Sequence, residues 1–247
     1  MITTDQVLVG REALLTATGH HPYARHALWR DHEARGWRRD GTVGWLLPPG
    51  QGPAGGAVGP AGPALDVFAE LVADGTLQAG DWLHLPRATP AEVAARLPVI
   101  RLLDEWDFLW TTAPPPEQAG EDRVVRLTEA DQPALGALIE SSFPSTTSRP
   151  GDPRIVAWYG IRDGDRLIAA GADRSRGDIG FLAGLTVATD RRGRGLGAAL
   201  TAGMTRILLD RYDQVALGVF TDNLGAIRLY RRLGFTGTEP RTSVQLG

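Results

Sequence analysis

A segment rich in arginine and glycine carries the strongest chemical signal in the sequence. Residues 185–200 read LTVATDRRGRGLGAAL, an apolar run followed by a basic, glycine-rich turn and then by a helix-like pattern. Glycines let main-chain N–H groups approach an anion closely, and the start of a helix adds unpaired N–H groups and a positive dipole end. Arg191, Arg192 and Arg194 add positive charge at the same place. The pattern predicts a pyrophosphate-binding loop between a strand and a helix.

Several kinds of pyrophosphate-bearing ligand use such a loop. A Walker-type nucleotide loop needs a lysine, and this chain has none, because all 26 of its basic residues are arginine. The spacing of Gly193, Gly195 and Ala198 fits a dinucleotide-binding pattern, but that pattern normally follows the first strand of its fold, and here several strands are expected before it. An acyl-coenzyme A, a dinucleotide and a purely structural turn remain as interpretations, and the first is favoured.

A second segment, residues 219–235, reads VFTDNLGAIRLYRRLGF. Together the two segments resemble the GNAT superfamily of N-acetyltransferases. The first matches the R-x-x-G-x-G/A loop of that family from Arg192 to Gly197, and the second matches its N-x-x-A-x-x-L-Y-x-x-x-G-F helix from Asn223 to Phe235. The resemblance extends over about residues 122–247, and the first 112 residues carry neither motif, as in glycine-N-acyltransferase-like members.

The resemblance implies a GNAT fold, an α/β fold whose mixed sheet opens between the strand ending at Val187 and the strand at residues 214–220. Unpaired main-chain groups at this opening would bond to the pantetheine arm of acetyl-CoA as an added strand does. Acetyl-CoA is therefore the expected cosubstrate, and no metal is expected. The residues expected to bind it are Leu185, Thr186, Val187, Arg192, Gly193, Arg194, Gly195, Leu196, Gly197, Ala198, Asn223 and Ala226.

The same resemblance makes Tyr230 the expected catalytic acid. When an amine attacks the thioester, a thiolate with a pKa of about 8.5 leaves, and a phenol with a pKa of about 10 can donate a proton to it. The alternative is a core tyrosine with its hydroxyl at the surface. Asn223 is the only asparagine in the chain, which favours a specific role beside that of a helix cap.

The group that accepts the proton of the attacking amine is harder to assign. Some relatives carry a glutamate on the strand before the loop, where this chain has Phe181. Transfer must then use another carboxylate or a chain of water molecules. The carboxylate candidates are Asp178, Glu140, Asp104, Glu105 and Asp107.

Proline and polar residues at 113–121, APPPEQAGE, predict a linker that divides the chain. Residues 122–247 are expected to form the catalytic domain, with elements in the order β-α-β-β-β-α-β-α-β. Residues 1–112 are expected to form an α/β or degenerate GNAT-like half. Within that half, the patterns predict two helices and a surface loop, at residues 4–18, 24–36 and 50–63 respectively.

Composition narrows the classes of function. The 247 residues carry a net charge of −3, which does not favour a nucleic-acid or membrane-surface binder. The absence of cysteine excludes a thiolate nucleophile, and no metal-binding motif joins the histidines at positions 20, 21, 26, 32 and 84. Neither a membrane helix nor a signal peptide is indicated, so a soluble cytoplasmic protein, monomeric or homodimeric, is expected.

These observations predict an N-acetyltransferase, an acyltransferase that moves an acetyl group from acetyl-CoA directly to a primary amine of a small molecule. A protein or peptide acetyltransferase and a non-catalytic acyl-CoA sensor are the main alternatives, and a nicotinamide oxidoreductase is a further one. An open acidic groove would favour a protein substrate. The presence of Tyr230 argues against a sensor, and cofactor binding separates the oxidoreductase from the others.

Overall fold

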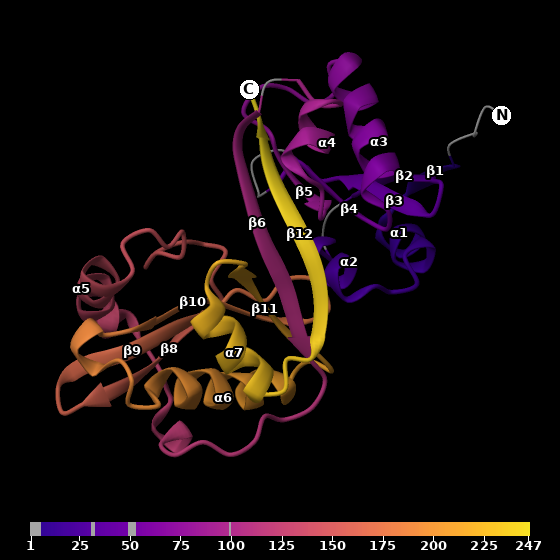
Figure 1. Cartoon of the computed structure of the whole chain (residues 1–247). Coiled ribbons are helices and arrows are strands. Elements are labelled where there is room, and N and C mark those ends of the chain that lie inside the picture. Colours follow the sequence, from indigo (N-terminus) through magenta and orange to yellow (C-terminus); the bar gives the residue numbers. More distant parts are fainter. Residues whose placement is uncertain (1–5, 31–32, 49–52, 99) are drawn as a thin grey trace. The chain divides into compact units, whose positions relative to one another are not determined.

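The computed structural model of the chain describes residues 6–30, 33–48, 53–98 and 100–247. The chain divides into two compact units (Figure 1). Unit 1 contains residues 1–108, 219–223 and 238–247, and unit 2 contains residues 109–218 and 224–237. The C-terminal strand thus belongs to the same unit as the N-terminal half. Within the described ranges, no helix combines the length and the apolar character needed to cross a membrane.

The sheet of unit 1 has the strand order β1-β2-β3-β4-β5-β12-β6. Neighbours are antiparallel from β1 to β4 and between β5 and β12, whereas β4 and β5 are parallel. The strands are β1 (Gln6–Val9), β2 (Arg35–Arg39), β3 (Thr42–Leu46), β4 (Gly55–Val58), β5 (Trp82–Pro86), β6 (Ile100–Thr111) and β12 (Gly237–Leu246). The helices are α1 (Arg11–Ala17), α2 (Pro22–Ala27), α3 (Ala61–Ala73) and α4 (Pro90–Ala94).

Helices cover both faces of this sheet. Side chains alternate along a strand, so Gly36 and Trp37 point to opposite faces. Gly36 lies against Leu14 of α1, whereas Trp37 packs on the core cluster under α3 and α4. Val244 and Leu246 of β12 are buried in the same cluster. Their burial anchors the C-terminal strand to the N-terminal half.

The expectation of a surface loop over residues 50–63 is wrong for part of that range. Gly55–Val58 is a buried strand, β4, which pairs with β3 and β5. Glycine is needed there for close packing, because a Cβ on Gly55 would lie 2.7 Å from the carbonyl oxygen of Trp45 and 2.9 Å from the ring of Phe68. A glycine-rich segment can therefore form an inner strand when its neighbours carry large side chains.

The Gly55→Ala substitution is expected to destabilise the protein by about 2 kcal/mol, because the new methyl group forces the strand to shift. Gly62→Ala is the matched control, since its Cβ would meet nothing within 4 Å and alanine favours a helix. Urea unfolding of both variants measures the difference in the free energy of unfolding. Equal stability of the two variants would contradict the packing described for β4.

Two helices expected in the N-terminal half are also corrected. Residues 6–9 form β1, which pairs with β2, and α1 begins only after Gly10, whose φ is +87°. The second helix ends at Ala27, and Arg35–Arg39 forms β2. Both strands depend on partners distant in the sequence, which local periodicity does not register. His32 and residues 50–52 lie outside the described residues.

From β7 to β12, the elements follow the order predicted from the sequence for residues 122–247. The sheet of unit 2 runs β11-β10-β9-β8-β7, with β10 and β11 parallel and the other neighbours antiparallel. The strands are β7 (Val125–Arg126), β8 (Ala157–Asp163), β9 (Arg166–Asp173), β10 (Gly180–Val187) and β11 (Val215–Phe220). The helices are α5 (Gln132–Ser142), α6 (Leu196–Leu209) and α7 (Leu224–Arg232). The predicted α/β class with a mixed sheet is confirmed.

Helices α5 and α6 cover opposite faces of the sheet of unit 2. Ala170 packs in a cluster with α5, whereas its neighbour Gly171 faces Met204 of α6. A capping box precedes α5, in which Thr128 and Asp131 each bond to the main chain of the other. This arrangement leaves β10 between the two helices, with its end directed into the loop before α6.

Candidate functional site

Strand β10 separates from β11 partway along its length. Three consecutive residues of each strand pair, and the last pair is Leu182 with Leu217. On its other side, β10 stays paired with β9 as far as Val187. The main-chain groups of β10 that follow Leu182 and face away from β9 are therefore left open, as the binding of an extended ligand requires.

The hydrogen bonds of β10 show which groups are open. Ala188 donates its main-chain N–H to the carbonyl of Ile168 at 2.9 Å. Because such bonds occur at every second residue of an antiparallel pair, the main chain of Thr186 also faces β9. Leu185 and Val187 face the other way. The open groups of the predicted edge thus come from Leu185 and from the N–H of Val187. The carbonyl of Val187 accepts a bond from Arg192 at 3.4 Å, and Thr186 is used within the sheet.

The arginine- and glycine-rich segment forms an exposed loop that ends at the start of α6. Gly193 and Gly195 have φ values of +75° and +78°, which residues with a side chain rarely adopt. The first main-chain bond at the start of the helix runs from the N–H of Ala199 to the carbonyl of Gly195, at 3.0 Å. Three earlier N–H groups have no acceptor within the helix, those of Leu196, Gly197 and Ala198. These groups can bind an anion.

The three arginines of the loop have different partners. Arg191 forms an ion pair with Asp163 at 2.9 Å, and Arg192 donates to the carbonyl of Ser142, at the end of α5, at 2.8 Å. Arg194 is exposed, and no acidic side chain in the described ranges pairs with it. Arg194 is therefore the cation of this loop that is most available to a phosphate group.

Gly197 lies where three elements of unit 2 meet. A Cβ on this residue would lie 3.5 Å from Leu229 of α7 and 3.9 Å from Val187 of β10. The start of α6, the end of β10 and the middle of α7 are therefore in contact. The fold brings the predicted loop and strand edge close to the helix that carries Tyr230.

Tyr230 is a buried residue of α7, with 9% of its surface exposed. Its ring centre lies 6.1 Å from that of Phe235. Burial raises the pKa of the Tyr230 hydroxyl to about 12, because apolar surroundings disfavour the charged phenolate. The phenol keeps its proton throughout the neutral pH range, as a proton donor must.

Comparisons with known proteins match part of the chain to a protein family and to an individual relative. The model of the FR47-like protein family matches residues 158–244, which hold the strands from β8 to β12. A mycothiol acetyltransferase from Thermobispora bispora is 43% identical over 70 residues. The matched part makes up 28% of this chain and 24% of that protein, so the chain spans about a quarter of the length of this relative.

Solved structures share the fold over nearly the whole chain. A GNAT-family protein from Novosphingobium aromaticivorans has a TM-score of 0.58 at 23% identity, covering 93% of this chain and 94% of its own. A GCN5-related N-acetyltransferase from Sphaerobacter thermophilus has a TM-score of 0.53 at 17% identity, covering 97% and 94%. The chain therefore has the fold of these GNAT proteins. Its first half, which carries no GNAT motif, is part of a fold that these two solved structures also have.

The predicted contacts Asn223 and Ala226 lie at the start of α7. Asn223 is exposed and directly precedes the helix, and its main-chain N–H donates to the carbonyl of Phe220 at 3.1 Å. Ala226 is half-buried in the first turn. Asn223 belongs to unit 1, whereas Ala226 and Tyr230 belong to unit 2.

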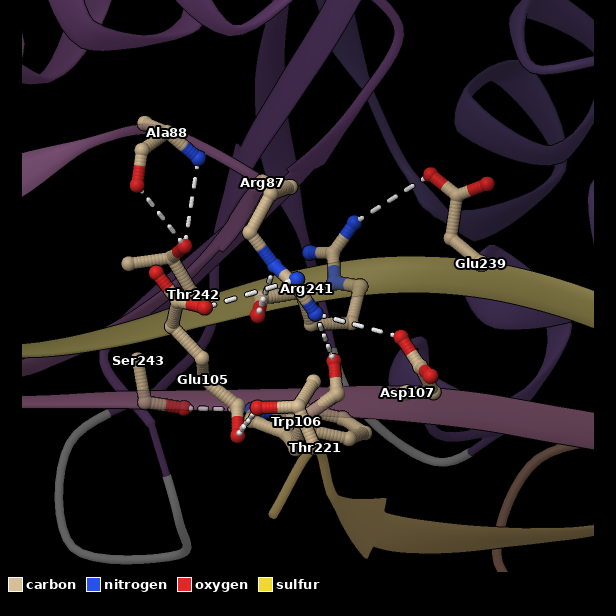
Figure 2. A network of polar contacts seen from close by, with 10 residues as sticks. All are labelled: Arg87, Ala88, Glu105, Trp106, Asp107, Thr221, Glu239, Arg241, Thr242 and Ser243. Atoms are coloured by element: carbon tan, nitrogen blue, oxygen red, sulfur yellow. Dashed lines mark hydrogen bonds and ion pairs between the residues drawn. The ribbon is translucent and has the colours of Figure 1, made fainter. Parts of the chain in front are cut away.

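Two of the carboxylates considered as bases are held by one arginine in unit 1. The side chain of Arg87 lies 3.1 Å from Asp107 and 3.5 Å from Glu105 (Figure 2). It also donates to the carbonyls of Trp106 at 2.9 Å and Arg241 at 3.1 Å. These contacts join the end of β5 to β6 and β12. Asp107 and Glu105 thus have a structural role in this GNAT fold.

The other predicted candidates lie in different places. Asp104 is half-buried on β6 in unit 1, and Glu140 is exposed near the end of α5. Asp178 follows β9, in the turn before β10, and Phe181 is half-buried on β10. Glu140 and Asp178 are the carboxylate candidates that share a unit with Tyr230.

Sequence reasoning missed two hydroxyl groups that lie against β10. Thr146 and Ser148 are buried, and Ser148 faces Gly184. The available signal was a glycine inside an apolar strand pattern, FLAGLTV, which often marks a bulge. Nothing in the sequence indicated which loop would cover that bulge.

Proposed function

We propose that this chain is an N-acetyltransferase that binds acetyl-CoA on unit 2 and transfers the acetyl group to a primary amine of a small molecule. The observation that carries the proposal is the junction of an open strand edge with an anion-binding loop. The edge at Leu185 and Val187 leads into the loop before α6, and Gly197 contacts both β10 and α7. A pantetheine arm attached to a pyrophosphate has the matching shape and chemistry.

Each part of the cofactor would have its own partners. The free N–H groups at the start of α6, from Leu196 to Ala198, would bind the pyrophosphate, and Arg194 would add charge. The amide groups of pantetheine would bond to the main chain of Leu185 and Val187. Acetyl-CoA itself supplies the activated thioester.

The chemistry proposed is direct transfer. The chain contains no cysteine that could carry the acetyl group, so the amine attacks the thioester itself. Tyr230, protonated at neutral pH, would donate its proton to the leaving sulfur. Glu140, Asp178 or a water chain would accept the proton of the amine.

The acceptor proposed is a small molecule. The relative from Thermobispora bispora is a mycothiol acetyltransferase, 43% identical to this chain over 70 residues. Because that relative is named for mycothiol, a small molecule, we favour small amines over proteins as acceptors for this chain. A panel of amino acids, amino sugars and polyamines is therefore the first set of acceptors to test.

The Arg194→Ala substitution is expected to raise the dissociation constant of acetyl-CoA about tenfold, the effect of losing one charged hydrogen bond to phosphate. Calorimetric titration measures it. Arg126→Ala is the matched control, because Arg126 is also exposed but lies on β7, at the opposite edge of the sheet of unit 2. Equal affinities of the two variants would contradict the assignment of the loop to the pyrophosphate. If the wild type binds a nicotinamide dinucleotide and not acetyl-CoA, the oxidoreductase is favoured.

A further inference from the structure

The segment that follows α5 places two buried hydroxyl groups beside β10. Ser148 is 2% exposed and Thr146 is 9% exposed. The main-chain N–H of Ser148 donates to Oγ1 of Thr146 at 3.2 Å, which fixes the turn between them. Both hydroxyls are therefore held in place by a short, ordered turn.

Gly184 makes room for Ser148 at the bulge of β10. Its φ is +58°, and a Cβ added to it would lie 2.9 Å from Cβ and 3.2 Å from Oγ of Ser148. The hydroxyl of Thr186 donates to the carbonyl of Gly184 at 2.9 Å and so supports the bulge. Ser148 thus lies directly on the part of β10 that follows the last pair with β11, at Leu182.

The hydroxyl of Ser148 has no hydrogen-bond acceptor among the described residues. Throughout the described ranges its Oγ makes no hydrogen bond, although the oxygen is not among the side-chain atoms that are both fully buried and without a partner. A hydroxyl of a buried residue that has no partner in the protein normally binds a ligand or an ordered water. Since a hydroxyl can donate its hydrogen, an acceptor atom of a ligand is a suitable partner.

We infer that Ser148 binds the acyl group, donating its hydroxyl hydrogen to the carbonyl oxygen of the acetyl thioester. The inference rests on the proposed function, which lays the pantetheine arm along β10 from Val187 toward the bulge. Gly184 lies three residues before Val187, about 10 Å along the strand, so the thioester end of the arm would reach Ser148 rather than the loop. A carbonyl oxygen is an acceptor, whereas the attacking amine needs its lone pair for the bond to carbon.

The hydrogen bond would strengthen during the reaction. As the amine nitrogen bonds to the carbonyl carbon, the π electrons of the carbonyl move to oxygen, and Ser148 stabilises the negative charge without giving up its proton. When the carbonyl reforms, the C–S bond breaks and its electron pair leaves with sulfur. The sulfur takes the proton of Tyr230, and the nitrogen releases its proton to a base or to water.

The test compares the Ser148→Ala and Ser148→Cys variants with the wild type in thiol release from acetyl-CoA with an amine acceptor. We expect kcat to fall about a hundredfold in Ser148→Ala. Ser148→Cys keeps the shape but donates weakly, so its kcat should fall nearly as much. The KM for acetyl-CoA and the dissociation constant of free CoA, which lacks the acyl group, should stay within about twofold of the wild type.

Ser141→Ala is the matched control, because Ser141 is exposed at the end of α5 and bonds to the carbonyl of Leu138. Its kcat should equal that of the wild type. A Ser148→Ala or Ser148→Cys variant that keeps wild-type kcat would overturn the inference and leave the proposed function intact. A parallel loss of kcat and of free CoA binding would assign Ser148 a structural role only. A wild type with no amine-dependent release would instead overturn the proposed function, and the inference with it.

Discussion

The Tyr230→Phe variant is expected to lose about a hundredfold or more in kcat while binding acetyl-CoA as the wild type does. The reason is that phenylalanine keeps the buried ring and its contact with Phe235 but removes the proton that the leaving sulfur needs. Since the pKa of a thiol is about 8.5, unassisted departure of the thiolate is slow but not impossible. A residual rate is therefore expected. Thiol release at saturating substrates measures kcat.

The pH dependence of the same reaction follows from the pKa of Tyr230. Burial raises it to about 12, so the hydroxyl is protonated below that pH and loses its proton only above it. Between about pH 7 and pH 10, the fraction of neutral amine grows while Tyr230 keeps its proton. The wild-type rate is therefore expected to rise across this range without a falling limb.

Tyr159→Phe is the matched control for both measurements. Tyr159 is buried as well and lies on β8 in the same unit. It should retain the wild-type kcat and pH profile. A Tyr230→Phe variant with the same kcat as Tyr159→Phe would show that another group, or water, protonates the sulfur.

The Gly195→Val variant is expected to lose measurable binding of acetyl-CoA, a rise in the dissociation constant of about fiftyfold or more. Gly195 has a φ of +78°, and valine is strongly disfavoured there. To relieve the strain, the loop must move, and the N–H groups at the start of α6 then no longer converge on one anion. Calorimetric titration with acetyl-CoA measures the loss.

Gly164→Val separates strain from cofactor binding. Gly164 has a φ of +57° in the β8–β9 turn, and its Cβ, like that of Gly195, would meet nothing within 4 Å. Both substitutions should lower the free energy of unfolding by about 1–2 kcal/mol. Only Gly195→Val should impair binding, and wild-type affinity in that variant would contradict the assignment of the loop to the pyrophosphate.

The second half of the chain could be predicted closely because its signals are local. The Asp163-Gly164 pair turns the β8–β9 hairpin, and the Thr128–Asp131 box precedes α5. Gly234, with a φ of +90°, follows the end of α7. Each of these features depends on residues within a few positions of one another, so single-sequence patterns contain them.

The first half could not be predicted as well because its strands depend on distant partners. Gly55–Val58 is a strand because Trp45 and Phe68 close over residues that lack bulk. The C-terminal strand pairs with β5, more than 150 residues away, as in the pair of Ser243 with His84. No local pattern records such contacts.

The candidate site was predictable in its motifs but not in its full set of residues. The loop, the edge of β10 and Tyr230 follow from two sequence blocks, and Gly197 lies against β10 and against the helix that carries Tyr230. Ser148 was not predicted, because it reaches Gly184 from a loop that carries no motif. Arg194 differs from Arg191 and Arg192, which bind Asp163 and the carbonyl of Ser142 respectively. The sequence alone does not reveal these two contacts.

Amine-dependent thiol release from acetyl-CoA by the full-length chain tests the central claim most directly. The account predicts release that requires both acetyl-CoA and a small primary amine, with the N-acetylated amine as the product in equal amount by mass spectrometry. Acetyl-CoA binding without release on any amino acid, amino sugar or polyamine would contradict the claim of small-molecule transfer. It would favour an acyl-CoA sensor or a protein substrate instead.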